Sequence, residues 1–106
     1  MLKPFFVRDN KVLKRIDPEQ VMCLEAVRNY TWIYLSDGTA HIARSTLSGT
    51  LKKLPPDIFI KIHRSLAVSI FFINDIARDH LIIGEKSIPI GRQYYSSAIK
   101  QLNVIE

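Results

Sequence analysis

The sequence has 106 residues, of which 47% are hydrophobic and 24% charged, so it excludes a disordered chain and predicts one compact domain over residues 1–106. Its longest nearly apolar run, Leu66–Ile73, is too short for a bilayer-spanning helix, and the first ten residues lack the apolar core of a secretory signal. The net charge of +5 favours a polyanionic partner, and the single cysteine, Cys23, fits a protein of the reducing cytoplasm.

Short segments with a two-residue alternation predict β-strands in the first half of the chain. Asp9-Asn10 and Asp37-Gly38 are turn residues that predict two hairpins. Asp17-Pro18 predicts one helical turn between them, because Asp caps helices and Pro suits their first position. The predicted strands of this half are Phe5–Arg8, Val12–Ile16, Val21–Val27, Tyr30–Leu35 and Thr39–Ala43.

The middle of the chain changes to the spacing of a helix. Leu47, Leu51 and Leu54 lie on one stripe of a predicted helix over Ser45–Leu54. We expect Ser45 to cap the start of this helix, since a serine hydroxyl can accept a hydrogen bond from a free backbone N–H of the first turn. Two prolines follow directly and end it.

The second half alternates again and then ends in a helix. Gly84-Glu85 predicts a hairpin, and Tyr95, Ile99 and Leu102 share one stripe of a final helix after Gly91. The extended segments predicted here are Ile58–His63, Ser65–Phe72, Ile76–Arg78, His80–Ile83 and Lys86–Ile90. Together the elements predict a mainly β domain with two short helices.

Polar residues interrupt the strand-like stretch FIKIHRSLAVSI, which covers residues 59–70. Lys61, His63 and Ser65 would share one face of a strand. Strict alternation would place Arg64 on the opposite face, among the apolar side chains. We therefore expect the strand to end near His63 and the backbone to turn Arg64 outward.

The sequence holds no pattern that indicates catalysis or metal binding. His41, His63 and His80 are not in ligand spacings, and no second cysteine is present. Ser65 follows His63 by two residues but lacks the glycine-framed turn of a nucleophilic serine, and no glycine-rich phosphate loop occurs. The sequence therefore predicts a protein that is not an enzyme and needs no metal or cofactor.

Four arginines stand at predicted loops or element ends, in Arg28-Asn29, Arg44-Ser45, His63-Arg64-Ser65 and Arg92-Gln93. Arginine forks read guanine, Asn and Gln read adenine, and Ser or His suits phosphate oxygens. Residues 36–70 hold five Lys and Arg against two Asp, so the positive charge is concentrated in the middle of the chain. On these residues alone, DNA binding and ordinary solvated charge both remain open.

Several motifs in order resemble the LytTR-type DNA-binding domain, the effector module of bacterial two-component response regulators. Leu24-Glu25-Ala26 with Asn29-Tyr30 matches the pattern x-E-A-x-x-N-Y, and the segment 59–65 matches F-x-R-x-H-R-S with Lys61 at the position of the first arginine. The segment 88–94, IPIGRQY, matches I-P-x-S-R-x-Y, with Gly91 in place of the usual serine. The opening hairpin and Arg44-Ser45-Thr46-Leu47 also correspond, so the resemblance covers about Phe5 to Leu102.

The resemblance implies an elongated arrangement of small antiparallel sheets whose loops enter the major groove of double-stranded DNA. Carried over position by position, the base readers are Arg64, Arg92 and either Arg28 or Asn29. Phosphate or positioning contacts then fall to the remaining matched residues, which are Arg44, Lys61, His63 and Ser65.

The resemblance also implies partners beyond DNA. A response regulator carries a receiver domain, which residues 1–106 do not contain, so the chain is either the effector domain of a longer regulator or a standalone version. Family members often bind paired sites, which predicts two copies on one DNA. No membrane contact is expected, because no apolar run is long enough to span a bilayer. Two alternatives stay open. One is a non-catalytic β-rich protein-interaction module, and the other is single-stranded nucleic-acid binding by Tyr30, Trp32 and Tyr34, which share a strand face.

Overall fold

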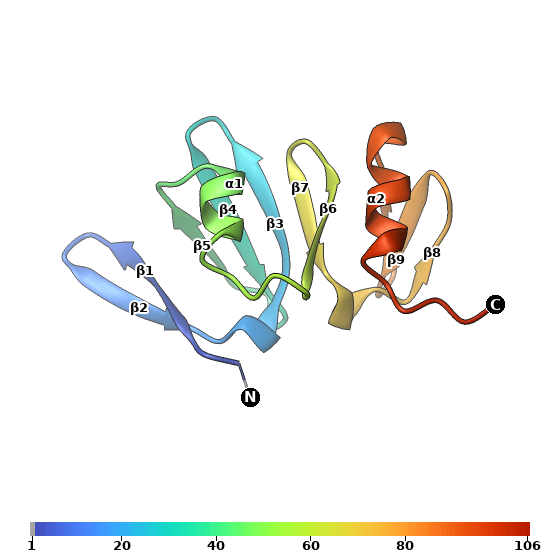
Figure 1. The fold of residues 1–106 in the computed structure, drawn as a ribbon. Helices are drawn as coiled ribbons and strands as arrows, with labels where there is room; N and C mark the ends of the chain where they lie inside the picture. The colour runs from blue at the N-terminus through green and yellow to red at the C-terminus, as the bar shows by residue number, and fades with distance from the viewer. Residues whose placement is uncertain (1) are drawn as a thin grey trace.

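The computed structural model describes residues 2–106, which form three antiparallel sheets side by side in an elongated body (Figure 1). The principal extents of this body are 48 × 31 × 25 Å. The mainly β prediction with small sheets and two short helices is therefore confirmed. The three sheets follow one another along the chain, and α1 lies between β5 and β6 of the central sheet.

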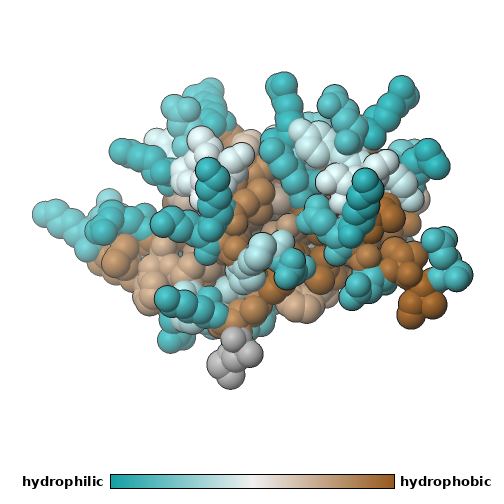
Figure 2. All heavy atoms as spheres, viewed as in Figure 1, coloured by the Kyte–Doolittle hydropathy of each residue, from teal (hydrophilic) through white to brown (hydrophobic). Residues whose placement is uncertain are grey.

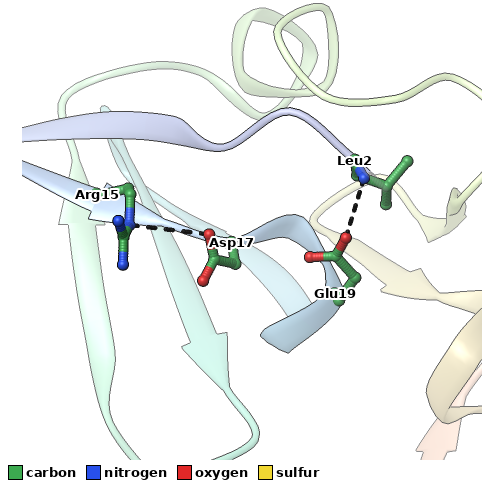
Figure 3. A network of polar contacts seen from close by, with 4 residues as sticks. All are labelled: Leu2, Arg15, Asp17 and Glu19. Carbon is green, nitrogen blue, oxygen red and sulfur yellow. Dashed lines mark hydrogen bonds and ion pairs between the residues drawn. The ribbon is translucent and has the colours of Figure 1, made fainter.

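The first sheet is the hairpin of β1 (Phe5–Asp9) and β2 (Val12–Ile16). Its turn places Asn10 at φ 59°, a left-handed conformation that asparagine tolerates well. After it, Pro18–Gln20 forms a single 3-10 turn, η1. Two polar contacts join the segments around η1 (Figure 3). The Leu2 backbone N–H donates to Glu19 Oε1 at 3.1 Å, and Arg15 forms an ion pair with Asp17 at 3.9 Å.

The second sheet has five strands in the order β5-β4-β3-β7-β6. The strands are β3 (Val21–Val27), β4 (Tyr30–Leu35), β5 (Ala40–Ala43), β6 (Phe59–His63) and β7 (Leu66–Ser69). Helix α1 (Leu47–Leu51) lies over one face of β3 and β4 (Figure 1). The hydrophobic core below it is built from residues of the hairpin, the sheet and α1, including Val7, Ile16, Leu24, Ile33, Leu47 and Leu54.

The third sheet packs on the other face of β6 and β7. It has the order β10-β9-β8, with β8 (Asp75–Ile76), β9 (His80–Ile83) and β10 (Lys86–Pro89), and it follows the 3-10 turn η2 (Ile70–Phe72). A further 3-10 turn, η3 (Arg92–Tyr94), leads into helix α2 (Tyr95–Lys100). The second core lies between these parts and consists of Ile60, Ile62, Val68, Leu81, Ile83, Ile90 and Ala98.

The helix predicted over Ser45–Leu54 is shorter than expected. Its N-cap is Thr46, whose hydroxyl accepts from the Gly49 backbone N–H at 3.0 Å, so the prediction that Ser45 caps it is wrong. The backbone carbonyl of Ser45 instead accepts from the Thr31 hydroxyl at 2.8 Å. This bond holds Ser45 to the sheet, and the helix can start only after it.

The end of β6 agrees with the sequence prediction. β6 stops at His63, Arg64 and Ser65 form the turn, and Arg64 is exposed. The register shifts between Lys61 and His63, so Ile62 remains fully buried while the chain turns outward. The strand predicted over Ile76–Arg78 is wrong at its end, because β8 stops at Ile76 and leaves Arg78 in the following turn.

Candidate nucleic-acid interface

The turn between β3 and β4 marks one end of the central sheet, at the top of Figure 1. Val27 pairs with Tyr30, so Arg28 and Asn29 are the two residues of this turn, and both are exposed. Ala43, the last residue of β5, pairs with Thr31 at the start of β4. Arg44 therefore leaves the sheet at the same end as Arg28 and Asn29.

The turn between β6 and β7 lies beside the end of β3. Leu66 pairs with Glu25, and the Ala26 backbone N–H donates to the Ser65 carbonyl at 2.8 Å. This bond fixes the turn of Arg64 and Ser65 next to the turn of Arg28 and Asn29. Antiparallel pairing thus gathers side chains that lie more than thirty residues apart in the sequence.

The segment before η3 joins the same end of the molecule. The Gly91 backbone N–H donates to the Ile62 carbonyl at 2.7 Å, which sets Arg92 beside the end of β6. Arg28, Asn29, Arg44, His63, Arg64, Ser65 and Arg92 therefore share one end of the sheets, which we call the basic edge. Figure 2 shows hydrophilic side chains projecting along this upper rim.

The arginines of the basic edge are free to meet a ligand. Arg28, Arg44, Arg64 and Arg92 are exposed. The ion pairs within residues 2–106 are Arg15–Asp17 and Asp79–His80, so none of these four guanidinium groups is neutralised by a carboxylate of the described chain. Unpaired guanidinium groups on one rim give a positive potential that attracts a polyanion.

Arg28 holds its position at a conformational cost. Its φ is 58°, in the left-handed region that favours glycine and disfavours side chains with a Cβ. A two-residue turn after a strand needs such an angle to reverse the chain. An arginine at this position is therefore not explained by the fold alone.

His63 and Ser65 organise the β6–β7 turn. The Ser65 backbone N–H donates to His63 Nδ1 at 3.2 Å, and the Ser65 hydroxyl lies 2.9 Å from the same atom. A backbone N–H can only donate, so Nδ1 accepts, and the neutral ring carries its proton on Nε2. The free Nε2–H is then a hydrogen-bond donor for an acceptor such as a phosphate oxygen.

Lys61 lies further from the end of the sheet than the other candidates, two residues before the end of β6. It is partly buried on β6, and its Nζ is 6.0 Å from the centroid of the Tyr94 ring. Tyr94 packs tightly here, since a Cβ on Gly91 would lie 2.9 Å from Tyr94 Cδ2. The structure therefore places Lys61 at the side of the basic edge.

The structure adds Arg78, which the sequence analysis did not select. The Ile90 backbone N–H donates to the Asp79 carbonyl at 2.9 Å, which brings the β8–β9 turn next to Arg92. Arg78 is exposed and lies 5.5 Å from the centroid of the Tyr95 ring. The signal was an arginine at an element end, as for the other four, but the strand was predicted to include it.

The neighbouring Asp79 is the acidic group of this turn. Its carboxylate lies 2.7 Å from His80 Nδ1, and this side-chain hydrogen bond lowers the pKa of Asp79. Asp79 is therefore ionised at neutral pH and offsets part of the positive charge of Arg78. The Asp79–His80 pair leaves the guanidinium of Arg78 without an ion-pair partner within residues 2–106.

Other chemistry finds little support in the geometry. Within residues 2–106, no group of three or more His, Cys, Asp or Glu side chains lies close enough to hold a metal ion. Burial raises the pKa of the Cys23 thiol, so this group is a poor nucleophile at neutral pH. None of the helices in the described part of the chain is long and apolar enough to cross a membrane.

Comparison with known proteins identifies the family. The family model described as the LytTr DNA-binding domain matches residues 11–103. Among solved structures, the fold is similar to the LytTr DNA-binding domain of a Bacillus cereus protein described as a methyl-accepting/DNA response regulator. The TM-score is 0.80 at 23% identity, covering 95% of this chain and 97% of that one. No curated protein matches. The chain belongs to the LytTr family of DNA-binding domains, whose general role is DNA binding in transcription regulation.

Proposed function

We propose that the domain reads the sequence of double-stranded DNA through the basic edge, as the effector domain of a response regulator in the bacterial cytoplasm. One observation carries this proposal: four separate turns or element ends bring unpaired arginines to a single rim. A fold that only needed solvated charge would have no reason to gather them there. In particular, Arg28 occupies a left-handed position that a glycine would fill at lower cost.

The shape of the domain supports contacts in successive major grooves. The basic edge runs along the long dimension of the molecule, from the β3–β4 turn to η3 (Figure 1). The whole molecule, including the β1–β2 hairpin and the C-terminal residues that lie outside the edge, is 48 Å long, and one helical turn of B-DNA is about 34 Å long. A duplex lying along the edge would meet the β3–β4 turn, the β6–β7 turn and η3 on the same side.

Base reading falls to the exposed arginines at the tips of the edge. Arg64 and Arg92, with Arg28 or Asn29, would enter the groove, where an arginine fork donates two hydrogen bonds to guanine O6 and N7. Each such pair contributes about 1–3 kcal/mol of discrimination against another base. The turns on which these residues lie are held by backbone hydrogen bonds to β3 and β6.

Phosphate contacts fall to the residues that lie behind the tips. Lys61, Arg44 and Ser65 can donate to the backbone, and His63 can donate through Nε2–H. Arg78 extends this set beyond Arg92, on the η3 side of the edge. Contacts of this kind fix the position of the protein on the duplex and make the affinity depend on salt.

The test starts from selection of duplexes out of a random pool by the intact chain. The selected duplex and a scrambled duplex are then titrated at low and moderate salt. Sequence-specific binding predicts tighter binding of the selected duplex and weak, salt-sensitive binding of the scrambled one. Absence of binding to either duplex at low salt would favour a protein-interaction module instead.

Two partners follow from the proposed function. A receiver domain in the same regulator would control the effector domain, and a second copy would bind the other half of a paired site. Titration of a duplex with two selected sites against a duplex with one tests the second point. We expect two copies of the protein to bind the duplex with two sites and one copy to bind the duplex with one site.

A further inference from the structure

The central sheet has one face that nothing in residues 2–106 covers over β4 and β5. On the covered face, Thr31 and Ile33 are fully buried. On the opposite face, Ile42 is 46% exposed and Tyr30 39% exposed. Directly paired residues share a face, so this open face is made of Cys23, Glu25, Val27, Tyr30, Trp32, Tyr34, Ala40 and Ile42.

Three aromatic side chains form a row along this open face. Tyr30, Trp32 and Tyr34 alternate on β4, so their backbone positions are roughly 7 Å apart. The Trp32 and Tyr34 rings have centroids 6.2 Å apart and an interplanar angle of 28°. The Tyr34 hydroxyl donates to Glu25 Oε1 at 2.9 Å, which fixes the last ring of the row. Tyr30 is exposed at one end of the row, and the stacked rings of Trp32 and Tyr34 are half-buried along it.

The far end of the row continues into a cleft of about 380 Å³. Its floor is formed by Cys23, Glu25 and Tyr34 of the open face, and its wall by Lys86 and Ile88 of β10. Most of the lining is apolar, and both a carboxylate and an ammonium group reach it. An apolar lining with a few polar groups is typical of clefts that bind small ligands.

Positively charged side chains flank the open face at both ends, although Glu85 stands next to one of them, Lys86. Arg28 stands at the end of the row beside Tyr30, Arg44 follows β5, and Lys86 lies across the cleft. Glu25 is the carboxylate on the face itself, and its charge is near Tyr34. A second copy docked face to face would bring the same positive rim against itself, which is unfavourable. A polyanion with aromatic groups is complementary to both the rings and the rim.

We propose that the open face binds single-stranded nucleic acid. Bases would stack on Tyr30, Trp32 and Tyr34, and phosphates would lie toward Arg28, Arg44 and Lys86. Stacking on an aromatic side chain contributes about 1–3 kcal/mol per base and tolerates any base. This activity is additional to duplex reading by the basic edge: it shares Arg28 and Arg44 with that edge, but its stacking side chains, Tyr30, Trp32 and Tyr34, are ones that duplex reading does not use.

The single tryptophan of the chain, Trp32, makes the test direct. The intact protein is titrated with an oligothymidylate of about 12 nucleotides, within the range bound by single-strand binding folds. We expect the oligonucleotide to quench Trp32 fluorescence. The quenching should saturate at the same protein-to-oligonucleotide ratio as the anisotropy of a labelled oligonucleotide. Absence of quenching at saturating oligonucleotide would overturn the proposal.

Variants separate this face from the basic edge. Tyr30→Leu and Trp32→Leu should each weaken oligothymidylate binding roughly 5- to 150-fold and leave binding of the selected duplex unchanged. Arg64→Ala should weaken binding of the selected duplex and leave oligothymidylate binding unchanged. If Arg64→Ala removed single-strand binding and both leucine variants kept it, the strand would lie on the basic edge, and the proposal would be wrong.

Two controls complete the experiment. Circular dichroism of each variant confirms that it folds, and Tyr30→Leu at an exposed position provides a second reading if Trp32→Leu unfolds. A shift of Trp32 fluorescence with protein concentration alone, together with no response to oligonucleotide, would show that a second copy covers the face and would also overturn the proposal. Duplex binding measured on the same samples keeps the two functions distinguishable.

Discussion

Replacement of Arg28 by glycine separates the folding role of this residue from its binding role. Arg28 has φ 58°, where an L-residue costs about 1–2 kcal/mol and glycine costs nothing. The greater freedom of glycine in the unfolded chain takes back about 0.5–1 kcal/mol. Arg28→Gly should therefore raise the free energy of unfolding by up to about 1.5 kcal/mol, with about 0.75 kcal/mol at the centre of the range. The same change removes a guanidinium from the basic edge and should weaken binding of the selected duplex roughly 5- to 150-fold.

Asn10→Gly is the matched control for this prediction. Asn10 has φ 59° in the β1–β2 turn, away from the basic edge, and asparagine tolerates this region better than arginine does. We expect a smaller gain in stability and no change in duplex affinity. Urea denaturation gives the stability of both variants, and fluorescence anisotropy gives their affinity for DNA.

Two results would refute the reasoning about Arg28. A loss of stability in Arg28→Gly would show that the left-handed turn is not strained by the arginine. A gain of stability with unchanged DNA affinity would show that the strained arginine is not retained for DNA. Either result is decisive only if the control variant, Asn10→Gly, shows the smaller gain in stability and the unchanged duplex affinity expected of it.

Three further predictions follow from the same geometry. Ser65→Ala removes the hydroxyl 2.9 Å from His63 Nδ1 and should lower the free energy of unfolding, measured in urea, by about 0.5–1.5 kcal/mol. Ser87→Ala, at an exposed position of β10, is the control and should leave it unchanged. Equal stability of the two variants would contradict the account. Lys61→Ala should weaken selected and scrambled duplexes equally and reduce the salt slope by about 1, whereas a selective loss would make Lys61 a base reader. Partial burial, followed by the hydrogen bond to Glu25, raises the pKa of Tyr34 to about 12, so stability from this group should be complete below about pH 10 and lost as the pH rises toward 12. Ultraviolet absorbance should show a tyrosine ionising near pH 12, and this ionisation should be absent from Tyr34→Phe. If it persisted in that variant, it would belong to another tyrosine and the prediction would be wrong.

Much of the fold was predictable because local rules decide it. The alternation of polar and apolar residues fixed most strand bounds, and the position of Arg64 correctly indicated where β6 ends. Asn10 and Gly38 both adopt the positive φ that their turns require. The start of α1 was not predictable, because a tertiary hydrogen bond from Thr31 to the Ser45 carbonyl moves the cap to Thr46.

The site was only partly predictable, for a related reason. The residue types at loop ends were visible in the sequence, but their convergence depends on the pairing of β3 with β7 and of Gly91 with Ile62. Arg78 was missed because β8 ends two residues earlier than its alternation suggests. The openness of the face carrying Trp32 depends on where the third sheet packs, which no local pattern encodes.

The most direct test of the central claim is the ratio of affinities for the selected and the scrambled duplex in Arg64→Ala and Arg92→Ala. If these two arginines read bases, each variant should lower this ratio roughly 5- to 150-fold while scrambled-duplex binding falls much less. Arg8→Ala, an exposed arginine of the β1–β2 hairpin, is the matched control and should leave the ratio unchanged. A ratio in Arg64→Ala and Arg92→Ala equal to that of the unmodified protein would contradict the account.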